Sequence, residues 1–206
     1  WPGNGESLNG LSQILWDRGD FDGVLEMFNA AIEKDPNNIP LWRMFFIAEN
    51  RKKLQGQIAE REKALRQKPD AREDALALLE LHFATGDTKG LQAFLDPSIT
   101  AFSKDPEFLR AAVDCAIEAR LVSQQLAAAC ALVAAEPDVA ENQYRLAKAA
   151  AENDDQALCL QATRRAIELG GLPMREGLGN AEKFKKYRSN EEFQALLRPP
   201  NGGVLK

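Results

Sequence analysis

The chain has 206 residues, of which 28% are charged and 45% are hydrophobic. This composition is typical of a folded protein and excludes an intrinsically disordered one. The excess of 31 acidic over 26 basic residues gives a net charge of -5, which argues against a nucleic-acid domain that gains affinity by neutralising phosphates. No stretch approaches the roughly 18 apolar residues of a membrane span. A single His and three Cys exclude most multi-His or multi-Cys metal sites.

The chain begins at Trp1 and not at a methionine, which suggests a processed chain or a fragment of a longer protein. We expect residues 1–7 to form a flexible N-terminal tail. A basic segment followed by an apolar one, typical of an export signal, is not visible at the start. The compartment therefore stays open between the cytoplasm and an exported location.

Helix stops recur about every 34 residues along the chain. They are Asp35-Pro36, Lys68-Pro69, Asp105-Pro106, Glu136-Pro137 and an equivalent Gly170-Gly171. An amphipathic stretch precedes each stop, and several of these stretches follow a short acidic or glycine turn, such as Gly19-Asp20 and Gly86-Asp87. The repeating unit is therefore predicted to be helix, tight turn, helix and stop.

The first unit shows the physical basis of this prediction. Val24, Phe28 and Ile32 recur at helical spacing, and Gly19 permits a turn with positive φ. Asp20 can cap the following helix. Because one hairpin cannot bury its own apolar face, neighbouring hairpins must stack. The predicted helices span 8–18 and 21–34, 40–52 and 55–67, 71–84 and 88–103, 107–119 and 121–134, and 139–152 and 155–169.

The chain resembles the tetratricopeptide repeat (TPR) family at this point. The first unit carries the family's pattern in Gly19-Asp20-Phe21, Phe28, Ala31 and Pro36, and Trp42 stands at the early tryptophan position of the second. The resemblance implies an all-α, right-handed superhelical solenoid of about five helix-turn-helix repeats over residues 8–171. The fourth unit departs from the family's pattern, because Arg120 replaces the turn glycine.

Residues 172–206 are expected to form a loop, a closing element and a frayed terminus. Gly170, Gly171, Pro173, Gly177 and Gly179 predict the loop. Ser189 or Asn190 can cap a last helix that carries Phe193, Leu196 and Leu197, and this resembles the closing element of bacterial arrays of the family. The alternative is an independent arm. Residues 199–203, Pro-Pro-Asn-Gly-Gly, predict the frayed end.

Two irregular features have more than one interpretation. Pro97 falls inside a predicted helix, where it either makes a tolerated kink or changes the curvature of the array, and Asp96 could cap a new helical turn there. Cys115, Cys130 and Cys159 are interpreted as small buried thiols, and a Cys115–Cys130 disulfide between neighbouring helices is the alternative.

The sequence contains no motif that indicates catalysis or a bound cofactor. The patterns GxGxxG, GxxxxGK[ST], HExxH and GxSxG are missing. His82 is the only histidine, and we expect it to pack or lie at a rim. We therefore predict no enzymatic activity, no metal site and no cofactor.

The resemblance implies that the first helix of each repeat lines a concave peptide-binding groove. Carried onto this chain, the inward positions are Asn9, Gln13, Asp17, Arg43, Met44, Ile47, Asn50, Glu73, Leu76, Glu80, Arg110, Asp114, Ile117, Tyr144, Arg145 and Lys148. The family's clamp for a C-terminal carboxylate needs Lys, Asn and Arg, but its slots hold Asn9, Gln13, Ile47 and Glu73, so this ligand is not expected.

Two parts of this groove suggest a binding chemistry. Met44, Ile47 and Leu76 could receive an apolar anchor of a peptide. Arg110, Tyr144, Arg145 and Lys148 converge and could grip a carboxylate; the alternative is that Asp114 and Glu141 neutralise them.

The leading hypothesis is a non-enzymatic scaffold or adaptor that binds a peptide segment of a partner protein, as a monomer or weak homodimer. The alternative is a self-assembly or docking region of a larger, enzymatic or membrane-associated protein, and a dimer through the first helix pair would favour it. An enzyme on a helical scaffold is the third hypothesis, and it would require a deep cavity with converging titratable groups.

Overall fold

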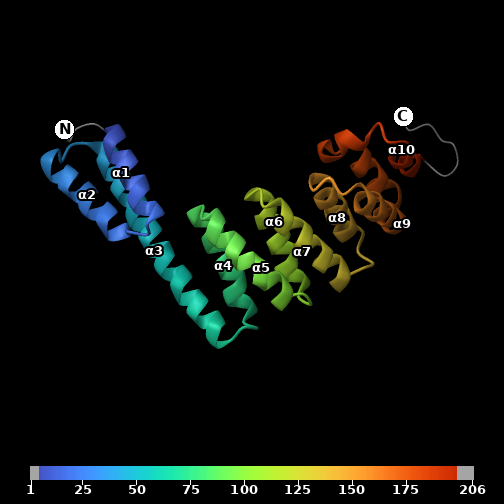
Figure 1. The fold of residues 1–206 in the computed structure, drawn as a ribbon, viewed down its shortest axis with the longest axis horizontal. Coiled ribbons are helices and arrows are strands. Elements are labelled where there is room, and N and C mark those ends of the chain that lie inside the picture. Colours follow the sequence, from blue (N-terminus) through green and yellow to red (C-terminus); the bar gives the residue numbers. More distant parts are fainter. Residues whose placement is uncertain (1–4, 199–206) are drawn as a thin grey trace. The chain divides into compact units, whose positions relative to one another are not determined.

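The computed structural model describes residues 5–198, which form helices and short connections without any strand (Figure 1). The expected frayed terminus at 199–203 and the first part of the expected N-terminal tail lie outside the described residues. The chain divides into two compact units, Trp1–Arg66 and Gln67–Lys206. The all-α architecture predicted from the sequence is confirmed.

Unit 1 contains α1 (Gly5–Asp17), α2 (Phe21–Lys34) and most of α3 (Ile39–Gln67). Leu8, Val24, Phe28 and Ala48 are buried together, so all three helices contribute to one core. The turn between α1 and α2 is the predicted one. Gly19 has a φ of 73°, and the carboxylate of Asp20 accepts a hydrogen bond from the N–H of Gly23 at 2.9 Å.

The second predicted hairpin is wrong: residues 39–67 form the single helix α3. In three other repeats the turn residue has a positive φ and lies 17 positions before the stop. These residues are Gly19 before Pro36, Arg120 before Pro137, and Asp154 before Gly171. Lys52 occupies this position before Pro69. The left-handed φ that the turn requires costs a non-glycine residue about 1–2 kcal/mol. Because Arg120 adopts this φ at the equivalent position, Lys52 disfavours the turn but does not alone explain why the helix continues through it.

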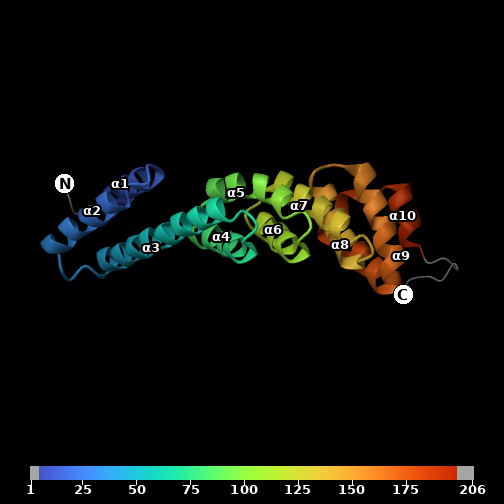
Figure 2. The same cartoon turned by 90° about the horizontal axis from the view of Figure 1, so that it is seen from below.

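Unit 2 consists of stacked helical hairpins (Figures 1 and 2). They are α4 (Arg72–Thr85) with α5 (Thr88–Ala101), α6 (Pro106–Glu118) with α7 (Val122–Ala135), and α8 (Ala140–Glu152) with α9 (Gln156–Asn180). Helix α4 packs on α6, α5 on α7, and α7 on α8, so each hairpin covers the apolar face of the one before. This is the predicted repeat solenoid.

Helix α5 is continuous through Pro97. Asp96 does not cap a new helix; its carboxylate accepts a hydrogen bond from the Gln124 side chain of α7 at 2.8 Å. The proline thus removes one helical donor without ending the helix.

The tail contains more helix than the sequence predicted. Gly171 breaks α9 with a φ of 62° and a ψ of -143°, but helix resumes up to Asn180 where a loop was expected. Proline is tolerated in the first turn of a helix, so Pro173 lies close enough to the break to allow this, and Leu178 is buried.

The tail then closes the end of unit 2. The 3-10 helix η1 (Glu182–Tyr187) packs on α8 and α9, and α10 (Glu191–Leu197) packs on α9. Phe184, Tyr187 and Phe193 are buried, with ring centroids 5.6 Å apart for Phe184–Phe193 and 6.2 Å apart for Tyr187–Phe193. Asn190 caps α10 by accepting from the N–H of Phe193 at 2.9 Å.

Candidate protein-binding surfaces

A row of apolar side chains is exposed along the first half of α3. Ile39, Trp42, Phe46 and Ile47 expose 78%, 39%, 57% and 39% of their surface. Together with Arg43 and Asn50 they line a shallow hollow of about 520 Å³. We call these six residues the α3 stripe. Their spacing of three and four residues places them on one face of the helix.

The aromatic part of the stripe is held in place by its neighbours. The indole N–H of Trp42 donates to the carbonyl oxygen of Pro36 at 2.9 Å. Trp42 also stacks on Phe46, with centroids 6.0 Å apart, and meets the edge of Phe45 at 6.2 Å. Because Phe45 packs against the core of unit 1, the exposed rings rest on a fixed base.

The residues around the stripe are predominantly basic. Residues 39–53 contain Arg43, Arg51, Lys52 and Lys53 but only one acid, Glu49. Lys52 forms an ion pair with Asp22 of α2, and the Arg51 guanidinium lies 4.4 Å from the centre of the Trp16 ring. Within residues 5–198, neither Arg43 nor Lys53 has an acidic partner. Two cations therefore border the stripe without compensation.

The predicted groove residues of unit 1 lie on α1 and α3, and not all of them face the stripe. Arg43, Ile47 and Asn50 belong to the stripe, whereas Met44 is half-buried and packs against the core. On α1, Asn9 and Gln13 are exposed, and the amide of Gln13 donates to Asp17 at 2.9 Å.

The sequence reasoning missed Ile39, Trp42 and Phe46. It placed Trp42 at the family's structural tryptophan position, but the neighbouring Leu41 is the residue that packs against the core. The recurrence of apolar residues at 39, 42, 46 and 47 was the signal that could have identified this face.

The predicted basic cluster of unit 2 is largely neutralised. Arg110 pairs with Glu136, which also accepts from the Asn142 amide at 3.0 Å. Arg145 of α8 pairs with Asp114 of α6, and its Nε lies 3.6 Å from Glu141. The sequence had offered this neutralisation as the alternative to a carboxylate grip.

Tyr144 and Lys148 form the rest of this predicted face. The Tyr144 ring contacts Phe184, with centroids 6.3 Å apart, and the Lys148 ammonium lies 5.3 Å from the centre of the Tyr144 ring. Burial and the nearby charge of Glu141 raise the pKa of the Tyr144 hydroxyl. On the preceding first helices, Glu73 and Glu80 are exposed, and Leu76 and Ile117 are half-buried.

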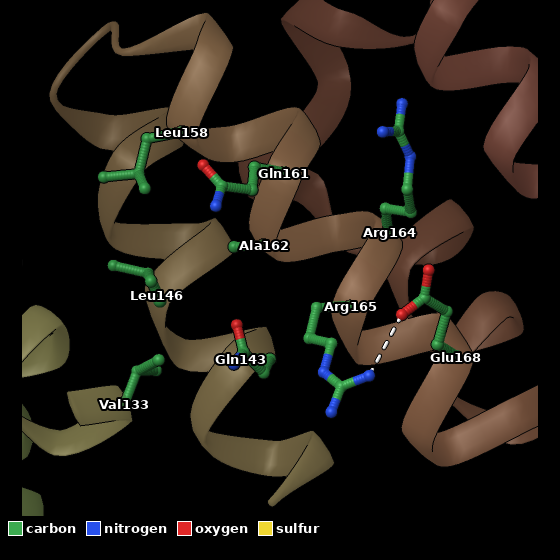
Figure 3. Close-up of a pocket in the computed structure, with 9 residues that line it drawn as sticks. All are labelled: Val133, Gln143, Leu146, Leu158, Gln161, Ala162, Arg164, Arg165 and Glu168. Carbon is green, nitrogen blue, oxygen red and sulfur yellow. Dashed lines mark hydrogen bonds and ion pairs between the residues drawn. The ribbon is translucent and has the colours of Figure 1, made fainter. Parts of the chain in front are cut away.

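A second hollow lies between the hairpins at the end of unit 2 and has a volume of about 400 Å³ (Figure 3). Leu146, Leu158 and Ala162 form its apolar part. The arginines that line it are already paired: Arg164 contacts Glu192 at 3.1 Å, and Arg165 contacts Asp138 at 2.6 Å and Glu168 at 3.2 Å. The hollow therefore offers no uncompensated cation among its lining residues.

The reactive side chains are dispersed. His82 is buried, stacks on Phe94 with centroids 5.9 Å apart, and places Nδ1 3.6 Å from the Asp87 carboxylate, as expected of a packing histidine. Cys115, Cys130 and Cys159 are free thiols, so the alternative disulfide is not formed. Cys130 is exposed and Cys115 half-buried, which corrects the expectation of three buried thiols.

Burial raises the pKa of all three thiols, and that of Cys159 rises to about 11. Among the described residues, no group of three His, Cys, Asp or Glu side chains could hold a metal ion. In residues 5–198, every helix is too short or too polar to cross a membrane.

No family model matches the sequence, and no curated protein matches it. Solved structures that match include MamA, with 13% identity, 90% of each chain covered and a TM-score of 0.44. A TPR protein from Parabacteroides merdae has 15% identity, covers 93% of this chain and 76% of its own, and has a TM-score of 0.43.

The structure of YrrB, described as a TPR protein with an unusual peptide-binding site, has 15% identity and a TM-score of 0.41, with 79% of this chain and 84% of YrrB covered. The stacked hairpins of unit 2, with their repeating turns and stops, give this chain a TPR-like all-α solenoid fold.

Proposed function

We propose that the protein is a non-enzymatic interaction scaffold that binds a peptide segment of a partner protein on the α3 stripe. The observation that carries the proposal is the exposure of Ile39, Trp42, Phe46 and Ile47 on one helix face. Contiguous exposed apolar surface of this kind is typical of protein interaction sites.

The composition of the stripe supports this proposal. Tryptophan, other aromatic residues and arginine contribute most to the binding energy of protein interfaces. Trp42, Phe46 and Arg43 provide these three types within two turns of one helix. Because the Trp42 ring is already fixed by Pro36 and Phe46, little side-chain entropy is lost when a ligand covers it.

The first-helix face of unit 2 is a less favourable site for the same ligand. The guanidinium groups of Arg110 and Arg145 are occupied by acids of the chain itself, so a ligand carboxylate would have to displace them. We therefore place the contact on the α3 stripe.

The test is a selection from a library of displayed random peptides against the full chain. Peptides enriched on the wild type should lose binding to Phe46→Asp, which puts a charge in the middle of the stripe. Phe83→Asp is the matched control, because Phe83 is an exposed phenylalanine of α4. The proposal is wrong if the enriched peptides bind Phe46→Asp as well as they bind the wild type.

A further inference from the structure

The backbone of α3 restricts the kind of peptide that the stripe can accept. Helix α3 is continuous from Ile39 to Gln67, so the main-chain N–H and C=O groups beneath the stripe are bonded within the helix. An extended peptide would find no main-chain partners there, and its own polar groups would face Ile39, Trp42 and Phe46. A helical peptide satisfies its own main chain and can bury an apolar face at no such cost.

The dimensions of the stripe also fit a helix. From Ile39 to Lys53 the helix rises about 21 Å, at 1.5 Å per residue. Lys53 follows Phe46 by seven residues and Asn50 by three, so it continues the same face. A partner helix of about 14 residues lying along α3 would therefore contact the apolar residues and both uncompensated cations.

The charge around the stripe is opposite to that of the whole chain. The chain carries a net charge of -5, whereas residues 39–53 hold four basic residues and one acid, a surplus of three positive charges. The pair between Lys52 and Asp22 removes one of these. Arg43 and Lys53, about 15 Å apart along the helix, have no acidic partner within residues 5–198.

We infer that the ligand of the α3 stripe is an amphipathic helix whose apolar face is flanked by acidic residues. This inference rests on the proposed function and adds the conformation and the charge of the ligand. Apolar residues of the ligand would cover Trp42 and Phe46, and its carboxylates would meet Arg43 and Lys53.

The experiment uses three fluorescent designed peptides and the full chain. Each peptide has 18 residues with leucines at helical i, i+3, i+4 and i+7 spacing. The first has glutamates at the flanking positions, the second has lysines there, and the third is the glutamate peptide with two central prolines. Fluorescence anisotropy gives their dissociation constants at low and moderate salt.

We expect the glutamate peptide to bind at least about tenfold more tightly than the lysine peptide, and to lose affinity as salt screens the charges. The proline peptide should bind at least about tenfold more weakly, because proline breaks the helix. In Arg43→Glu/Lys53→Glu the preference should reverse in favour of the lysine peptide. Lys63→Glu, an exposed charge reversal elsewhere on α3, should leave it unchanged.

Equal binding of the glutamate and lysine peptides would overturn the charge part of the inference, as would an unchanged preference in the double variant. Equal binding of the proline peptide would overturn the helical part, and failure of all three peptides to bind would overturn both. The library selection with Phe46→Asp tests whether the stripe binds peptides at all, so it shows whether the further inference or the proposed function has failed. Enriched peptides that are lost in Phe46→Asp but are neither helical nor acidic would leave the proposed function standing.

Discussion

The Trp42 indole donates its hydrogen bond to the carbonyl oxygen of Pro36, which belongs to the stop that ends the first repeat. The residue that prevents α2 from continuing thus provides the acceptor that orients an exposed aromatic ring at the start of α3. With Phe46 stacked against it, the Trp42 ring is held in a fixed orientation on the surface of unit 1.

Trp42→Phe should weaken peptide binding about three- to tenfold, because the aromatic ring is no longer oriented by the hydrogen bond to Pro36. Loss of this intramolecular hydrogen bond should also lower the unfolding free energy by up to about 1 kcal/mol. Trp42→Ala should cost more than tenfold in affinity, because it also removes the aromatic contact surface. Titration of a selected peptide, with thermal melting as a check on folding, measures both. Unchanged affinity in Trp42→Ala would show that Trp42 is not an anchor.

The continuity of α3 can be measured directly. Spin labels on Glu49→Cys and Lys63→Cys, in a chain whose three native cysteines are replaced, should be separated by about 21 Å along the helix axis. A closed hairpin at residues 52–54 would bring the two helix segments to an interaxial distance of about 10 Å. Pulsed electron resonance distinguishes the two, and a short distance would contradict the single helix.

The missing hairpin shows where repeat spacing stops being a reliable guide. The stop at Pro69 lies at the expected repeat spacing, but the residues of the expected turn are not turn residues. Lys52 and Lys53 occupy the positions at which Gly19 and Asp20 make the first turn. The position 24 residues before the stop also differs: it holds a small buried residue, Ser12 or Ala147, in the first and last repeats, but Phe45 in this one. A ring at this position hinders the close approach of two helices.

The predicted groove residues included Arg43, Ile47 and Asn50 of the stripe but not its aromatic residues, for a related reason. Leu41, Trp42 and Phe45 are all large and apolar, so the sequence alone did not say which of them face the core. Packing against the core of unit 1 decides this: Leu41 and Phe45 are both half-buried against it, whereas Trp42 is exposed. In the tail, glycine-rich composition predicted a loop over residues 170–179, but burial of Leu178 stabilises helix there.

The aromatic cluster at the end of the array should be essential for unit 2. Phe193→Ala removes a fully buried ring that stacks on Phe184, and large-to-small changes of this kind cost about 3–5 kcal/mol. Lys185→Ala, an exposed residue of η1, should change the unfolding free energy by less than about 0.5 kcal/mol. Denaturant titration compares the two, and similar midpoints for both variants would contradict a closing role of the tail.

The thiols should differ in reactivity and in their effect on stability at alkaline pH. Cys130 is exposed and Cys159 buried, so an alkylating reagent should label Cys130 first and Cys159 only after unfolding. The pKa of Cys159 is about 11 in the folded chain, against 9.0 for an unperturbed cysteine, mainly because burial disfavours the thiolate. Between these values the unfolded chain has released the proton and the folded chain has not.

The folded state should therefore lose stability as the pH rises from 9 to 11, by up to about 2 kcal/mol from this thiol, since one pKa unit corresponds to 1.36 kcal/mol. Below pH 9 both states hold the proton, so the thiol makes no pH-dependent contribution there. Cys159→Ala removes this contribution, and Cys130→Ala is the exposed control. Denaturant unfolding at pH 8, 9, 10 and 11 should show a flatter profile for Cys159→Ala than for the wild type; parallel profiles would place the pKa of Cys159 near its ordinary value.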